Sequence, residues 1–137
     1  MDSETVRKIL QDSILNLFAN QPNIFDFTSE TGQTEWNLAH HYANEIHTLI
    51  SNYDCDLDVV KLNFDNRRPD IIFHSRGNHK SNFLIVEVKR DGDKAEIESD
   101  VQKIKSAWFK EPLRYRFGAV VNLMGDKTGV VKIFENR

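Results

Sequence analysis

Two short apolar runs separated by a polar connection lie near the middle of the chain. Residues 71–73 are Ile-Ile-Phe, residues 83–86 are Phe-Leu-Ile-Val, and the polar residues 76–82 between them include a glycine. Runs of this length, rich in β-branched and aromatic residues, are typical of buried β-strands. A connection of this composition suits a hairpin turn. The sequence therefore predicts two consecutive strands that pair with each other.

Helical periodicity appears on both sides of this hairpin. Before it, apolar residues recur at helical spacing over about residues 4–19, with Ser3 as the expected N-cap, and again from about residue 34 to residue 49. After it, Asp93 and Glu96 have the spacing of a capping box. A single apolar helical face follows this box, made by Ile97, Val101, Ile104 and Trp108.

Three further segments have the composition of strands, namely 57–62, 117–121 and 129–134. The predicted order along the chain is therefore α-α-β-β-β-α-β-β. A chain of 137 residues has the size of one domain and can bury one core. We expect a single α/β domain over residues 1–137, with a mixed central sheet flanked by helices and the last strand at the edge.

The net charge of −3 conceals an uneven distribution of charged residues. Residues 1–60 hold 2 basic and 10 acidic side chains, whereas residues 61–116 hold 13 basic and 9 acidic ones. The middle of the chain is therefore locally basic although the whole is acidic. Affinity for a phosphate backbone depends on such local patches. A solvated surface of mixed charge is the alternative interpretation for any one of these lysines.

Composition also bears on the expected compartment. Cys55 is the single cysteine, so no internal disulfide can form, and a reducing cytoplasm is the expected location. The first twenty residues carry acids and a polar-striped helical pattern, which is not the pattern of a signal peptide. No apolar stretch approaches the length that spans a membrane. We therefore expect a cytoplasmic protein that makes no membrane contact.

Two acids and a lysine are expected to meet at the ends of the paired strands. Asp70 precedes the first strand, and Glu87 and Lys89 end the second. Because side chains alternate across a strand, Glu87 and Lys89 share one face while Val86 and Val88 pack on the other. Neighbouring acids repel unless a cation joins them or one acid takes up a proton. A structural salt bridge from Lys89 to either acid is the alternative interpretation.

Such a group of oxygen ligands and an ammonium suits metal-dependent hydrolysis of a polyanion. Mg²⁺ prefers carboxylate and carbonyl oxygens and keeps several of its waters. A cation of this kind polarises a phosphodiester and lowers the pKa of water at the site. Lys89 would orient the water or neutralise charge that develops in the transition state.

The pattern Pro69-Asp70 followed by Glu87-Val88-Lys89 resembles the signature of the PD-(D/E)XK, or restriction-endonuclease-like, nucleases. The resemblance implies an α-β-β-β-α-β core, which would cover about residues 34–122, with residues 1–33 as an N-terminal helical extension. It also implies that Asp70, Glu87 and the main-chain carbonyl of Val88 bind Mg²⁺ or Mn²⁺, with Lys89 as the catalytic basic residue.

The resemblance extends to residues outside the short motif. Many members carry a glutamate on the first core helix, and Glu35 corresponds to it; the alternative is a favourable acid at a helix N-terminus. Members also often carry polar residues on the helix after the motif, where Asp100 is followed by Gln102 and Lys103. An exposed ion pair between Asp100 and Lys103 is the simpler interpretation for those two residues. Residues expected to contact nucleic acid are Arg67, Arg68, Arg90, Gln102 and Lys103.

These observations predict a metal-dependent nuclease that hydrolyses DNA phosphodiester bonds, with Asp70, Glu87, Lys89 and Glu35 in its active site. RNA is not excluded as the substrate, and a homodimer or a larger complex is compatible with so small a core. The alternative is a catalytically inactive module of the same fold that binds protein or nucleic acid. The acidic N-terminal half favours that alternative, and the intact Asp70, Glu87 and Lys89 set opposes it.

Overall fold

The computed structural model describes residues 1–25, 34–57, 70–77 and 80–137, and the side chains of all of these except residues 34 and 35. The elements in chain order are α1 (Ser3–Asn20), α3 (Thr34–Leu49), β1 (Asp54–Leu57), β2 (Ile71–His74), β3 (Leu84–Arg90), α4 (Lys94–Lys103), β4 (Phe117–Leu123) and β5 (Gly129–Glu135). A π-helical turn, η2 (Ile104–Trp108), continues α4. The predicted order of helices and strands is confirmed for the described residues.

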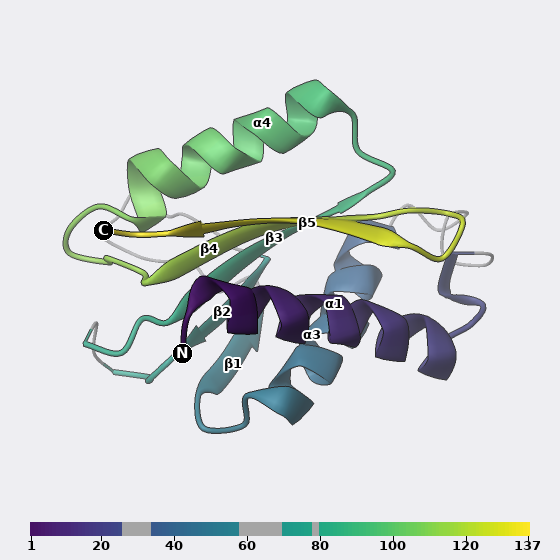
Figure 1. Cartoon of the computed structure of the whole chain (residues 1–137), viewed down its shortest axis with the longest axis horizontal. Coiled ribbons are helices and arrows are strands. Elements are labelled where there is room, and N and C mark those ends of the chain that lie inside the picture. Colours follow the sequence, from purple (N-terminus) through teal and green to yellow (C-terminus); the bar gives the residue numbers. More distant parts are fainter. Residues whose placement is uncertain (26–33, 58–69, 78–79) are drawn as a thin grey trace.

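The strands form one mixed sheet with the spatial order β1-β2-β3-β4-β5. β3 and β4 are parallel, and the other neighbouring pairs are antiparallel. The chain returns from the end of β3 to the start of β4 through α4, as a parallel pair requires. Figure 1 shows α4 on one side of the sheet and α1 and α3 on the other. The predicted mixed α/β domain and its C-terminal edge strand are confirmed.

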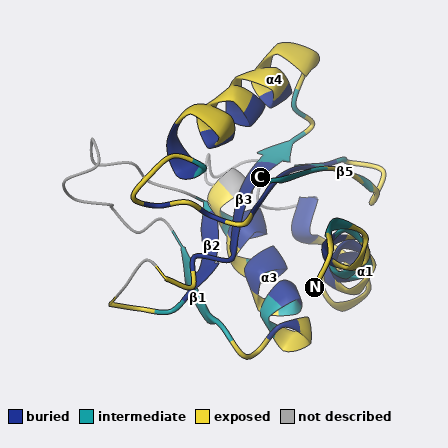
Figure 2. Cartoon of the chain, turned by 60° about the vertical axis from the view of Figure 1, so that its left-hand side comes forward, coloured by how far each residue is buried: buried dark blue, intermediate teal, exposed yellow. Residues whose placement is uncertain are grey.

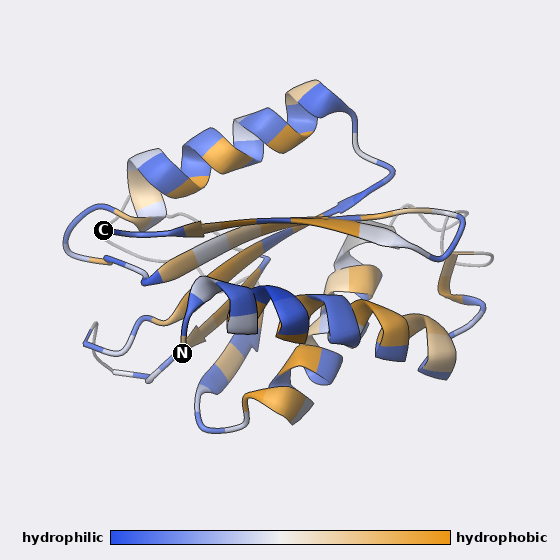
Figure 3. Cartoon of the chain, in the orientation of Figure 1, coloured by the Kyte–Doolittle hydropathy of each residue, from blue (hydrophilic) through white to orange (hydrophobic). Residues whose placement is uncertain are grey.

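The two faces of the sheet bury different amounts of apolar surface. The face toward α1 and α3 carries the larger core, which includes Leu10, Leu17, Tyr42, Phe73 and Phe117. The face toward α4 carries a smaller one, which includes Ile72, Ile85, Ile97, Ile104 and Trp108. Figure 2 shows the central strands mostly buried between these layers, and Figure 3 shows apolar stripes on the helix faces toward the sheet. The predicted apolar face of the helix after residue 93 is confirmed.

Helix α1 begins at Ser3, the residue predicted to be its N-cap, so its actual N-cap is Asp2. The side chain of Asp2, rather than that of Ser3, accepts the hydrogen bond from the Thr5 N–H, at 2.8 Å. The prediction of Ser3 as the N-cap is wrong because two adjacent residues could both cap, and the aspartate carries the charge that favours a helix N-terminus. No helix in the described ranges is long and apolar enough to cross a membrane.

Strand β1 also differs from its prediction. It begins at Asp54, three residues before the predicted start, and residues 58–62 of the predicted segment lie outside the described residues. Asp54 and Asp56 lower the apolar content of this segment. The strand forms despite that composition because β1 pairs along its whole length with the buried strand β2.

Gly118 lets the α4 layer approach the sheet closely. A Cβ atom at this position would lie 2.5 Å from Cγ2 of Ile104 and 3.1 Å from the Phe109 ring. No real Cβ atom makes so short a contact, so a side chain here would push the helix away from β4. This glycine therefore sets how close α4 lies to the sheet. It also sets the position of the polar residues on α4.

Candidate active site

The register between β2 and β3 places Asp70 opposite Glu87. Ile71 pairs with Val86 in an antiparallel ladder, so the residue before Ile71 faces the residue after Val86. The Asp70 side chain accepts a hydrogen bond from the main-chain N–H of Val88, with 2.7 Å between Oδ2 and N. Asp70 therefore extends the pairing of the two strands by a side-chain contact, just before the start of β2.

The carboxyl groups of Asp70 and Glu87 share one proton. Glu87 is only 5% exposed. Its burial, together with the nearby Asp70 carboxylate, raises the pKa of Glu87 from 4.5 to about 9. Burial also raises the pKa of Asp70, although the Val88 N–H and the Glu87 carboxyl that bond to it act in the opposite direction. At neutral pH Glu87 is therefore the protonated acid, and its O–H donates to the Asp70 carboxylate.

Lys89 lies on the same face of β3 as Glu87, as strand alternation predicts. Its Nζ atom is 3.3 Å from Oδ2 of Asp100, and their side chains are 21% and 4% exposed. The more exposed Lys103 places its Nζ atom 3.5 Å from Oδ1 of the same aspartate. Asp100 in turn raises the pKa values of both Asp70 and Glu87 through its charge. We refer to Asp70, Glu87, Lys89 and Asp100 as the charged cluster.

The loop between β3 and α4 fixes the helix above the charged cluster. The Asn122 side chain accepts from the Gly92 N–H at 2.8 Å and donates to the Gly92 carbonyl at 3.0 Å. Asp93 then caps α4 by accepting from the Glu96 N–H at 2.8 Å, so the predicted capping role of Asp93 is confirmed. These contacts tie the first turn of α4 to β4, directly beside Lys89, which pairs with Asn122 in the sheet.

Asp100 is the part of the site that sequence reasoning misjudged. The ion pair predicted with Lys103 is present, but the prediction that this pair is exposed is wrong, because Asp100 is only 3% exposed. Its position contained a signal: Ile97, Asp100, Val101 and Ile104 follow the i, i+3, i+4, i+7 spacing of the buried face. A charged residue in an apolar stripe must find a partner, and Lys89 supplies it.

The other residues predicted to form the active site or to contact nucleic acid do not all gather at the charged cluster. The side chain of Glu35, together with Arg67 and Arg68, lies outside the described residues. Arg90 turns to the opposite face of β3, where its guanidinium carbon lies 4.9 Å from the centre of the Phe25 ring. Gln102 is exposed on α4. Of the nucleic-acid contacts predicted from the sequence, the structure brings Lys103 alone, among the residues it describes, next to the charged cluster.

The donor set for a metal ion consists of two carboxyl groups and a main-chain carbonyl. In a strand, the N–H and C=O of one residue point to the same side, so the Val88 carbonyl faces the edge where its N–H meets Asp70. Within the described parts of the chain, no group of three or more His, Cys, Asp or Glu side chains is arranged to hold a metal ion. Metal binding here would therefore depend on Asp70, Glu87 and the Val88 carbonyl.

A cation suits the electrostatics of these groups. Glu87 holds its proton because a second buried negative charge beside Asp70 is unfavourable. A divalent cation would remove that cost by replacing the proton, and carboxylate and carbonyl oxygens are the ligands that Mg²⁺ prefers. The chemistry of the donor set therefore fits a hard divalent cation.

Comparison with protein-family models, with curated proteins and with solved structures finds no match to this chain.

Proposed function

We propose that the protein is a metal-dependent nuclease of the PD-(D/E)XK type that hydrolyses DNA phosphodiester bonds. The observation that carries the proposal is the contact between Asp70 and Glu87, with Lys89 on the same face of β3 two residues further on. Two acidic side chains from different strands are rarely buried against each other unless they bind a cation or take part in catalysis.

The order of the elements gives the proposal independent support. From α3 to β4 the chain reads α-β-β-β-α-β, which is the order expected of the nuclease core. Asp70 lies just before the second strand of that core, and Glu87 and Lys89 lie in the second half of the third strand, as the Pro-Asp and Glu-x-Lys motif leads us to expect. Element order alone does not determine function, so this observation adds to the site rather than replacing it.

In the proposed mechanism Asp70, Glu87 and the Val88 carbonyl would hold Mg²⁺ or Mn²⁺. The cation would supply charge stabilisation at the phosphate and lower the pKa of the attacking water. To serve as a ligand, Glu87 would release the proton that it holds at neutral pH, so that both acids would be carboxylates. Lys89 contacts the attacking water or a phosphate oxygen, and its ammonium stabilises the charge that develops there. Asp100 is a positioning residue that holds the Lys89 side chain over the site.

A non-catalytic binding module is the second candidate, and the burial of the cluster favours it. Glu87 is protonated without a cation, and Lys89 already has Asp100 as its partner. A cluster of this kind could serve as a purely structural network. Metal binding separates the two functions, because a structural network gains no stability from Mg²⁺ or Mn²⁺, whereas a real site is stabilised by about 3 kcal/mol at a hundredfold excess over Kd.

The test is cleavage of supercoiled, linear, single-stranded and branched DNA, with a parallel RNA series, in Mg²⁺, Mn²⁺ or EDTA. Wild-type protein should cut in either metal and not in EDTA. Lys89→Ala should lose cutting, whereas Lys8→Ala, which changes an exposed lysine of α1, should retain it. Cutting that persists in Lys89→Ala would come from a contaminant. Folded protein that neither cuts nor gains stability from metal would overturn the proposal.

A further inference from the structure

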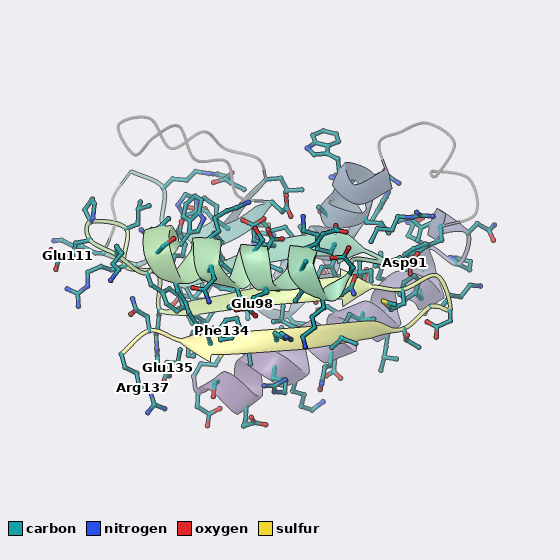
Figure 4. All side chains as sticks on the ribbon, turned by 90° about the horizontal axis from the view of Figure 1, so that it is seen from above. Asp91, Glu98, Glu111, Phe134, Glu135 and Arg137 are labelled. Atoms are coloured by element: carbon teal, nitrogen blue, oxygen red, sulfur yellow. The ribbon has the colours of Figure 1, made fainter. Side chains whose placement is uncertain are left out.

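The edge strand β5 presents one face toward α4, beside the charged cluster. Val130, Lys132 and Phe134 alternate with inward-facing residues, so they form a strip along the α4 side of the edge strand. Figure 4 shows α4 alongside β5, with Phe134 on this strip, Asp91 at one end of the helix and Arg137 at the other end of the molecule. Because α4 covers the central strands, β5 is left partly uncovered, and Val130 is 56% exposed.

Two separate hollows lie along this strip. The first, of about 210 Å³, is lined by residues that include Lys94, Ile97, Val120, Val130 and Lys132. The second, of about 440 Å³, is lined by residues that include Arg7, Lys105, Phe134 and Arg137. We refer to the surface formed by Lys94, Lys105, Val130, Lys132 and Phe134 as the α4–β5 groove. Its floor is largely apolar at the first hollow, and lysines stand on both of its sides.

The charges of the α4–β5 groove favour an anionic occupant. Lys94, Lys105 and Lys132 are exposed, and none of the three has an ion-pair partner among the residues the structure describes. Lys105 places its Nζ atom 4.9 Å from the centre of the Phe134 ring. One acid, Glu98, lies a turn after Lys94 on the same flank of α4. Glu135, at the far end, is paired with Arg137 at 3.2 Å.

The groove adjoins the charged cluster directly. Gly92 and Asn122 line its first hollow, and a Cβ atom on Gly92 would lie 3.1 Å from the Cβ atom of Lys89. In the sheet, Asn122 pairs with Lys89 on one side and with Val130 on the other. A polymer bound in the groove would therefore have one end beside Lys89.

We propose that the α4–β5 groove binds a single-stranded segment of nucleic acid that leads away from the charged cluster. Lys94, Lys105 and Lys132 contact phosphates, while Val130 and Phe134 contact the faces of bases. Only a single strand offers both groups at once, because a duplex buries its base faces in the stack. An acidic peptide would use the lysines but would leave the apolar strip without a partner. The inference rests on the proposed function for its substrate class.

The test measures binding and not cleavage. Anisotropy of a labelled oligothymidylate is recorded in EDTA over a series of salt concentrations, for wild type and for the triple variant Lys94→Glu, Lys105→Glu, Lys132→Glu. The loss of three phosphate contacts should weaken binding at least about tenfold at low salt and make the slope of log K against log salt shallower by about 2. A duplex of the same length and polyglutamate serve as competitors, and both should compete poorly.

A charge-matched control keeps the test specific. The control is a second triple variant, which changes the net charge by the same amount at exposed positions outside the groove. Its substitutions are Lys80→Glu, Lys110→Glu and Lys127→Glu. This control should retain nearly the wild-type affinity and salt slope. Equal losses in the two triple variants, a groove variant that binds like wild type, or equal competition by duplex or by polyglutamate would each overturn the inference.

Failure of this inference can be told apart from failure of the proposed function. If the wild type cuts DNA with metal but the groove variant binds oligothymidylate as well as the wild type does, the binding role of the groove is refuted and the proposed nuclease activity stands. Groove-dependent binding by a protein that cuts nothing would refute the nuclease and leave the groove as the binding surface of a non-catalytic module. Val130→Asp supplies a second variant at an exposed position, and it should weaken oligothymidylate binding without reversing a lysine.

Discussion

The two faces of the sheet differ in the size of their apolar cores and in the acids they bury, although the same strands form both. The face toward α1 and α3 is closed by a large, continuous apolar core. The face toward α4 has a smaller core, and beside it Asp100 and Glu87 are both buried. Burying the Asp100 charge costs free energy, so we expect the face toward α1 and α3 to contribute more stability than the face toward α4. The helices α1 and α3 therefore cover the larger apolar core, whereas the face toward α4 holds the buried acids Glu87 and Asp100.

The largest expected effect comes from a substitution that creates a cavity in the larger core, and it tests whether that core is the main source of stability. Phe73 is fully buried on the α1–α3 face, in β2. Phe73→Ala should lower the free energy of unfolding by about 3–5 kcal/mol, since it removes a large side chain from a tightly packed region. Urea denaturation measures the loss, and Phe73→Leu, which keeps most of the volume, should cost less than about 1.5 kcal/mol. A small cost for the alanine variant would show that the larger core is not the main source of stability.

The second test concerns the dependence of stability on pH. The pKa of Glu87 in the folded protein, about 9, lies above its ordinary value of 4.5. The stability that the protonated acid contributes is therefore complete below pH 4.5 and is lost as the pH rises toward 9. Between pH 6 and pH 8 the free energy of unfolding should fall by at most about 3 kcal/mol from this group.

Denaturation of Glu87→Gln over the same pH range is the matched measurement. Glutamine cannot ionise, so the decline should flatten in this variant. Mg²⁺ should flatten it in wild type as well, because a bound cation replaces the proton, and should have no such effect on Glu87→Gln. A wild-type stability that rises between pH 6 and pH 8 would contradict the assignment of Glu87 as the protonated acid.

These two faces also show how far the sequence alone could predict the structure. The hairpin and the shared side of Glu87 and Lys89 followed from apolar runs and strand alternation, which are local patterns. The same alternation already implied that Arg90 faces away from Lys89, and the structure has it over Phe25. The burial of Asp100 depends on the depth of α4 over the sheet, which Gly118 and the Asn122 contacts set through long-range packing.

The third test addresses the ion pairs inside the α4 face. Asp100→Asn removes the charge that faces Lys89 and should cost about 1–2 kcal/mol of stability, because the ion pair between Lys89 and Asp100 is lost in a half-buried position. The cost stays at this level because the change also relieves the repulsion between Asp100 and the Asp70 carboxylate.

Lys103→Ala is the matched variant for this pair. Lys103 is 55% exposed, and Asp100 retains Lys89 when Lys103 is removed. The cost should therefore be below about 1 kcal/mol. Chemical denaturation in low salt compares the two variants. Equal costs would mean that Asp100 serves the surface pair and does not position Lys89.

The smallest expected effect belongs to Gln102, on the outer side of α4. Its side-chain amide donates to Oε1 of Glu98 at 2.9 Å, an exposed contact between successive helical turns. Gln102→Ala should change stability by less than about 0.5 kcal/mol, because the lost contact is weak and alanine favours the helix. A position that contributes so little to folding can reveal its role only through binding. Weaker oligothymidylate binding by Gln102→Ala, with stability unchanged, would extend the nucleic-acid surface over the top of α4. Unchanged binding would confine that surface to the groove beside β5.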